Sequence, residues 1–95
     1  MVLLKDILNK FDLDLPITEN MKNIEIMDSD YNPFSKYNIE NDEYIFRGKF
    51  KNKEIYWTVV VNLDKMIVEC DTWEIDEEFS SYEIYDETGE MVESA

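Results

Sequence analysis

Three runs of residues with high β-strand propensity follow one another along the chain with very short connections. They cover residues 43–50, 54–61 and 66–73, and only three and four residues separate them. Aromatic residues alternate with polar ones in the first run, while β-branched and aromatic residues occupy both faces of the second, as in a central strand. Runs with this spacing predict an antiparallel meander.

The segment before these runs predicts one amphipathic helix over residues 2–12. Its apolar residues fall at helical spacing, at Leu3, Leu4, Ile7, Leu8 and Phe11. Pro16 disfavours helical backbone at the residue before it and so ends the pattern. A helix this short depends on packing, so we expect its apolar side to cover a sheet.

The remaining segments complete a small α+β domain. Residues 22–27 alternate and predict a short strand, residues 28–42 predict a long loop, and residues 82–85 predict a weaker strand. Residues 90–93 are expected to return as a frayed hairpin arm. The predicted fold for residues 1–95 is a single domain, with an N-terminal helix packed on a four- to five-stranded antiparallel β-sheet.

The chain has no histidine and one cysteine, which excludes most catalytic and zinc sites. A Ser/His/Asp or Cys/His constellation cannot form, and neither can a Cys/His zinc site. Cys70 lies between Glu69 and Asp71, whose carboxylates raise a thiol pKa, so we expect a buried structural cysteine. Paired carboxylates are inevitable among 23 acidic residues, so they do not indicate a hydrolase. We expect no enzymatic activity.

One segment matches the opening of a calcium-binding loop. Asp28, Asp30 and Asn32 have the spacing of the first ligands of an EF-hand. Pro33 and Ile39 stand where that loop needs glycine and glutamate, and turns rich in Asp and Asn have this pattern by default. We therefore expect neither a metal nor a cofactor.

The acidic residues are concentrated in the last third of the chain. The whole chain has a net charge of −14, from 23 acidic and 9 basic residues. Residues 1–65 hold 12 acids and all nine bases, whereas residues 66–95 hold 11 acids and no base. This asymmetry predicts that the acidic residues form a binding face for a basic partner and are not spread evenly over the surface.

Aromatic side chains lie among these acids, as in protein interfaces that combine buried anchors with a charged rim. Acids two apart on a strand are separated by about 6.6 Å, which is similar to successive phosphates of a nucleic acid. The predicted partner-binding residues are Glu69, Asp71, Trp73, Glu74, Asp76, Glu77, Glu78, Tyr82, Glu83, Tyr85, Asp86, Glu87 and Glu90.

A smaller basic cluster is made by Arg47, Lys49, Lys51 and Lys53, which alternate along seven residues. Nucleic-acid binding depends on neutralising phosphates, and four bases do not outweigh the net charge of −14. We expect no direct binding of nucleic acid; these bases instead balance nearby acids and protect a sheet edge.

In size and charge the chain resembles two functional groups of small acidic proteins. One comprises phage or mobile-element inhibitors of host defence nucleases, such as anti-CRISPR, anti-restriction and DNA-mimic proteins. The other comprises immunity proteins that neutralise a cognate toxin. The resemblance implies a non-enzymatic inhibitor that occludes a basic, nucleic-acid-handling partner such as a nuclease, effector or toxin. The phosphate-like spacing favours the phage-type inhibitor, and an immunity protein is one alternative. The other alternative is an accessory structural module whose acidity serves solubility.

We expect a cytoplasmic protein with no membrane association. The longest apolar stretches fall far short of the ~20 residues needed to span a bilayer. The first residues contain no basic region typical of a signal peptide, and a single cysteine fits a reducing compartment.

Overall fold

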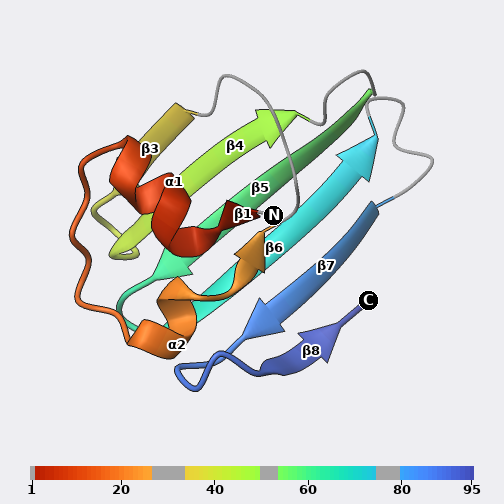
Figure 1. Ribbon diagram of the computed structural model, residues 1–95. Helices are drawn as coiled ribbons and strands as arrows, with labels where there is room; N and C mark the ends of the chain where they lie inside the picture. Colours follow the sequence, from red (N-terminus) through yellow and green to blue (C-terminus); the bar gives the residue numbers. More distant parts are fainter. Residues whose placement is uncertain (1, 27–33, 50–53, 75–79) are drawn as a thin grey trace.

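The computed structural model describes residues 2–26, 34–49, 54–74 and 80–95 (Figure 1). The elements in chain order are β1 (Val2–Leu3), α1 (Leu4–Lys10), α2 (Glu19–Lys22), β2 (Glu25–Ile26), β3 (Phe34–Asn38), β4 (Glu43–Lys49), β5 (Ile55–Asn62), β6 (Ile67–Glu74), β7 (Ser80–Tyr85) and β8 (Met91–Ser94). Strands β3 to β8 form one antiparallel sheet in which every strand pairs with the next in sequence. Strands β1 and β2 form a separate antiparallel pair.

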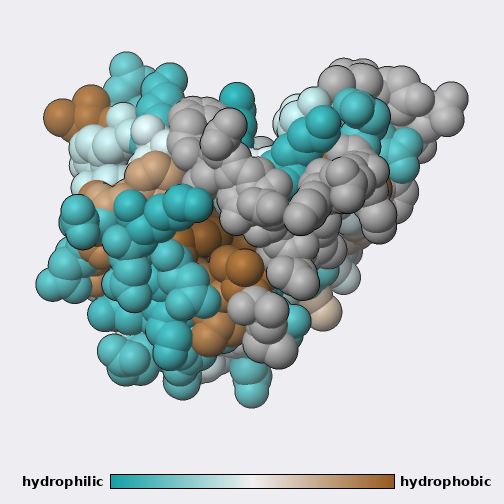
Figure 2. Space-filling model, turned by 45° about the horizontal axis from the view of Figure 1, so that its top comes forward, coloured by the Kyte–Doolittle hydropathy of each residue, from teal (hydrophilic) through white to brown (hydrophobic). Residues whose placement is uncertain are grey.

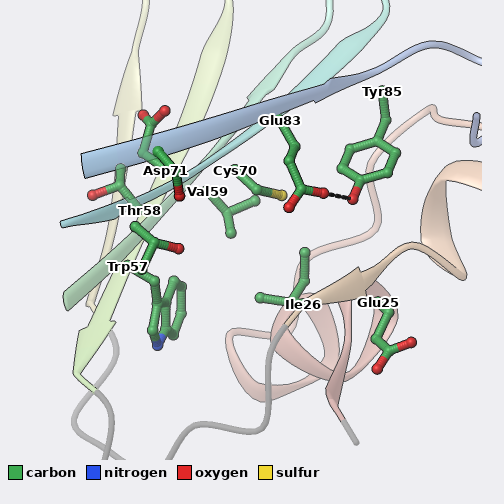
Figure 3. A pocket seen from close by; sticks show the side chains of 11 residues that line it. Glu25, Ile26, Trp57, Thr58, Val59, Cys70, Asp71, Glu83 and Tyr85 are labelled. Atoms are coloured by element: carbon green, nitrogen blue, oxygen red, sulfur yellow. Dashed lines mark hydrogen bonds between the residues drawn. The ribbon is translucent and has the colours of Figure 1, made fainter. Parts of the chain in front are cut away.

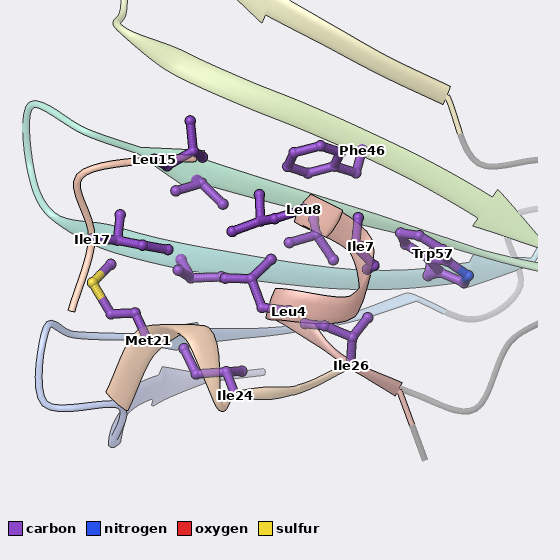
Figure 4. Close-up of a cluster of buried hydrophobic side chains, with 13 residues drawn as sticks. Leu4, Ile7, Leu8, Leu15, Ile17, Met21, Ile24, Ile26, Phe46 and Trp57 are labelled. Atoms are coloured by element: carbon purple, nitrogen blue, oxygen red, sulfur yellow. The ribbon is translucent and has the colours of Figure 1, made fainter. Parts of the chain in front are cut away.

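The two helices and the β1–β2 pair lie together over one face of the large sheet (Figure 1). Their apolar side chains meet those of the central strands in one hydrophobic core (Figure 4). The N-terminal layer contributes Leu4, Ile7, Leu8, Leu15, Ile17, Met21, Ile24 and Ile26, and the sheet contributes Phe46, Trp57, Val59, Val61 and Val68. The architecture thus has two layers, and the other face of the sheet points away from the helices.

The predicted N-terminal helix is present but shorter than residues 2–12. Its first residues are drawn into the β1–β2 pair, and the backbone N–H of Leu3 donates to Asp6 Oδ2 at 2.8 Å. The chain leaves the helix after Lys10, and Asp12 has a φ of 55°. Leu4, Ile7 and Leu8 are buried, which confirms that the apolar side of this helix covers the sheet.

The prediction of four or five strands was wrong, because the large sheet has six. The additional strand, β3, lies inside residues 28–42, which were predicted to be a loop. Its sequence mixes aromatic and polar residues, and its pairing with β4 determines its structure more than its own propensity does. The Tyr37 and Tyr44 rings are 4.7 Å apart across this pair, and the Tyr37 hydroxyl donates to Asp42 Oδ1 at 2.9 Å.

The structure also differs from the prediction over residues 22–27, where a single strand was expected. Only Glu25 and Ile26 are extended, and the four-residue helix α2 precedes them. Thr18 begins this helix, since its hydroxyl oxygen accepts a hydrogen bond from the Met21 N–H at 3.1 Å. The alternation that suggested a strand places Ile24 and Ile26 in the core.

The two edges of the large sheet carry the most exposed large hydrophobic side chains among the described residues. These are Tyr37 and Ile39 near the β3–β4 turn, and Met91 and Val92 on β8. The view in Figure 2 shows mostly hydrophilic surface, with hydrophobic surface concentrated near the middle. Strand β8 pairs with β7 through an irregular register and is exposed throughout, which confirms the predicted hairpin arm over Met91–Ser94 instead of 90–93.

The described part of the chain contains no helix long and apolar enough to cross a membrane.

Candidate functional site

The strand register determines which side chains share the sheet face opposite the helices, which we call the open face. Residues that pair directly across an antiparallel sheet lie on the same side of it. Three neighbouring rows of the open face run from β4 to β7. They are Lys49–Tyr56–Trp73–Ser80, Arg47–Thr58–Asp71–Tyr82 and Ile45–Val60–Glu69–Ile84. Four predicted partner-binding residues, Glu69, Asp71, Trp73 and Tyr82, therefore lie together.

An aromatic stack crosses the first of these rows. The Tyr56 and Trp73 rings lie 4.8 Å apart at an angle of 20°. Lys49 Nζ lies 5.9 Å from the centre of the Tyr56 ring, and Trp73 Nε1 donates to Thr58 Oγ1 at 3.4 Å. These contacts hold two half-buried aromatic rings in fixed positions on a face over which the described part of the chain places no helix.

The carboxyl groups of Glu69 and Asp71 form a close pair beside this stack. Partial burial, the hydrogen bond with Glu69 and the charge of Glu69 together raise the pKa of Asp71 from 3.8 to about 6. Neighbouring carboxylates raise the pKa because two like charges at short distance disfavour ionisation. Asp71 is therefore about half protonated near pH 6 and becomes fully charged only at higher pH.

This pair is expected to make the stability of the protein depend on pH. Between the unfolded and folded pKa values the folded state binds the extra proton, so this contribution decreases as the pH rises from about 4 to above 6. Replacing Asp71 with Asn removes the effect. The Asp71→Asn variant should therefore gain stability relative to the wild type at pH 7 and lose that gain at pH 4. Urea unfolding midpoints across this range measure the difference.

A matched control is Glu19→Gln, which removes an exposed carboxylate from α2 on the other side of the molecule. Its urea midpoint should follow that of the wild type at every pH.

The charged or titratable groups nearest Asp71 on the open face are Glu69 on β6, Tyr82 on β7 and, two strands away, Arg47. A difference between Asp71→Asn and wild type that is constant with pH would contradict the assignment.

Two other predicted partner-binding residues, Glu83 and Tyr85, lie on the helix-covered face. With Cys70 and Ile26 they surround a cavity of about 40 Å³ between β2 and the large sheet (Figure 3). The Tyr85 hydroxyl donates a hydrogen bond to the Glu83 carboxylate. The cavity has room for water but not for a substrate of ordinary size.

The Cys70 thiol and the Tyr85 hydroxyl beside this cavity are held in their protonated forms. Burial, followed by the charges of Glu83, Asp71 and Glu69, raises the pKa of Cys70 to about 12. Burial and the contact with Glu83 also raise the pKa of Tyr85. Cys70 packs against the core as a protonated thiol, which agrees with its predicted structural role. Within the described ranges no three acidic or cysteine side chains are close enough together to hold a metal ion.

The other predicted partner-binding residues are dispersed. Glu74 ends β6 opposite Ile55 and alternates to the helix-covered side. Asp86, Glu87 and Glu90 lie around the β7–β8 turn, where Gly89 has a φ of 80°. Hydrogen bonds from the Thr88 hydroxyl and, at 2.9 Å, from the Thr88 N–H to the Asp86 carboxylate lower the pKa of Asp86.

The turn is attached to the helical layer, because the Thr18 hydroxyl donates to the Glu87 carbonyl at 2.6 Å. Asp76, Glu77 and Glu78 lie outside the described residues, as do the candidate calcium ligands over 28–32 and the bases Lys51 and Lys53. The acids are consequently not one continuous array among the described residues.

Sequence reasoning missed Tyr56, Thr58 and Ser80 as members of the open face beside the acids. Each belongs to a different strand from Asp71 and Trp73, and only the pairing register brings them together. The alternation of β5 and β6 contained part of this signal, but the register depends on the turns between them.

Comparison with protein-family models, curated proteins and solved structures finds no match to this chain. The feature of the chain that indicates a function is therefore the geometry of its open face.

Proposed function

We propose that this chain is a non-enzymatic inhibitor that binds and occludes a basic surface of a partner protein. The observation that carries the proposal is the common placement of Glu69, Asp71, Trp73 and Tyr82 on the open face. An antiparallel sheet commonly leaves one face to solvent, but that face is then mostly polar. Here it holds a half-buried aromatic stack next to a carboxyl pair.

The two kinds of side chain have different tasks in such a complex. The carboxylates speed encounter with a basic surface and select for it, whereas aromatic contact area slows dissociation. The bases of the open face lie away from Asp71: Arg47 and Lys49 are on β4, two strands from it, and Lys36 is on β3, one strand further. This separation of charge fixes the orientation, with the basic surface of the partner over β6 and β7.

The proposed partner is a nucleic-acid-handling protein in the same cytoplasmic compartment. A protein that binds phosphates presents a basic groove, which is the surface that an acidic inhibitor complements. We favour an inhibitor of a phage-restricting nuclease or effector, with neutralisation of a cognate toxin as the alternative. An adjacent toxin gene supports the alternative, and a prophage setting beside a CRISPR or restriction locus supports the first.

The charge of the open face is expected to control the association rate. The variant Glu69→Lys/Asp71→Lys should associate with the purified effector or toxin encoded beside the gene about 10- to 100-fold more slowly at low salt. Biolayer interferometry at low and high salt measures this rate. The dissociation rate should change less, because Trp73 and Tyr82 remain.

A control variant carries the same charge change away from the open face. Glu19→Lys/Glu40→Lys replaces exposed acids on α2 and in the β3–β4 turn. Equal slowing by both double variants would show that only the net charge matters and would favour the accessory module instead.

A further inference from the structure

Among the residues that the structure describes, the aromatic stack of the open face leaves one side of Trp73 without a side chain of similar size. Tyr56 on β5 covers one face of the indole ring. On the opposite side the directly paired residue is Ser80 on β7, which is small and exposed. The row Lys49–Tyr56–Trp73 therefore continues into an open position above Ser80.

A recess of about 370 Å³ occupies this position. Its lining includes Asp71 and Trp73 on β6, Ser80 and Tyr82 on β7, and Ala95 next to β7. The volume is at the lower end of that of small-molecule sites, about 300–1,000 Å³. It combines an aromatic wall, a carboxyl group and hydroxyl groups in one place.

We propose that this recess binds the guanidinium group of an arginine side chain from the partner. This inference rests on the proposed function and specifies the partner group that the open face recognises. A planar guanidinium stacks on an indole ring and donates two parallel hydrogen bonds to a carboxylate. Trp73 supplies the ring and Asp71 supplies the carboxylate from the same strand, two residues apart.

Two features of the site favour a cation over an apolar side chain. The same stack already has Lys49 over its other end, at the outer face of Tyr56, so its rings are suited to cation–π contact. Partial burial and Glu69 also disfavour the charged form of Asp71, and a bound cation relieves this. Arginine is favoured over lysine because the recess is bounded by the flat ring of Trp73, on which a planar guanidinium can stack.

The test compares two capped peptides, tetra-arginine and tetra-lysine, which carry equal charge. Isothermal titration calorimetry of each peptide with the full chain should show about tenfold tighter binding of the arginine peptide. Asp71→Asn and Trp73→Leu should each weaken arginine binding about tenfold and make the two peptides equivalent. Glu19→Gln should leave both affinities unchanged.

A second variant tests the site without removing any of its groups. Ser80→Phe places a ring in the open position, where it pairs across the strands with Trp73 and is expected to keep the fold. It should block the arginine peptide as strongly as Trp73→Leu, and circular dichroism confirms that the sheet persists.

Each outcome bears on one proposal. The arginine site is overturned if both peptides bind with equal affinity and if neither Trp73→Leu nor Ser80→Phe changes that affinity. This result leaves the open face as a binding surface. Failure of the proposed function is recognised separately, by equal slowing of the two charge-reversed double variants. Loss of selectivity in Trp73→Leu, Asp71→Asn and Ser80→Phe, with Glu19→Gln unaffected, supports the site.

Discussion

Replacing Phe46 with alanine is expected to lower the free energy of unfolding by about 3–5 kcal/mol. Phe46 is fully buried on β4, and its ring lies 5.7 Å from that of Phe11 beyond α1. The substitution removes the contact between the sheet and the helical layer at its centre and leaves a cavity that rigid strands cannot close. Since domains of this size are stable by about 5–15 kcal/mol, the loss would remove from about a fifth of this margin to all of it.

Urea unfolding followed by circular dichroism measures this loss. The Phe46→Leu variant keeps most of the volume and should lose clearly less stability. Ile39→Ala removes an apolar side chain that is 79% exposed and should change the free energy by less than about 0.5 kcal/mol. A loss of about 1 kcal/mol or less in Phe46→Ala would show that the helical layer contributes little to stability.

The substitution Gly48→Ala is expected to lower the free energy of unfolding by about 2–3 kcal/mol. The cause is overpacking, whereas Phe46→Ala leaves a cavity. A Cβ atom at this position would lie 2.7 Å from Trp57 Nε1 and closer still to Cε2 and Cζ2 of the same ring. Trp57 is only 3% exposed, so its rigid indole has no free space to move into. Glycine is needed here because β4 passes directly under this ring.

A double variant separates this clash from a general weakness of alanine in the strand. Trp57→Phe shortens the ring and removes the indole N–H, which has no hydrogen-bond partner among the described residues. Gly48→Ala/Trp57→Phe should therefore be about 1 kcal/mol more stable than Gly48→Ala alone, a non-additive result expected of residues in contact. Thermal and urea unfolding both report it; strictly additive losses would contradict the proposed clash.

The sheet could be predicted from the sequence wherever strands carry their own hydrophobic signal. Strands β4, β5 and β6 were placed within one or two residues, because alternation and short turns determine them locally. Strand β3 could not be found, since its stability comes from pairing with β4. The division of the N-terminal segment into β1, α1, α2 and β2 also depends on what each piece covers.

The candidate site was predictable in its acids and aromatics but not in its geometry. Alternation alone places Glu69, Asp71 and Trp73 on one side of β6. It does not show that Glu83 and Tyr85 belong to the covered side, which requires the register between β6 and β7. The recess beside Trp73 forms because this large residue pairs with the small Ser80 on the neighbouring strand. The sequence of neither strand alone shows this pairing.

The sequential order of the six strands also bears on how the chain acquires its structure during synthesis. Every pairing in the sheet joins segments adjacent in the chain, so closure of each hairpin requires only a short loop. The helical layer is different: α1 leaves the ribosome first, yet the surface that buries Leu4 and Leu8 is built from β4, β5 and β6. Its apolar residues therefore remain exposed until β4, β5 and β6 have been synthesised, and the core becomes complete only when the helix packs against these later strands.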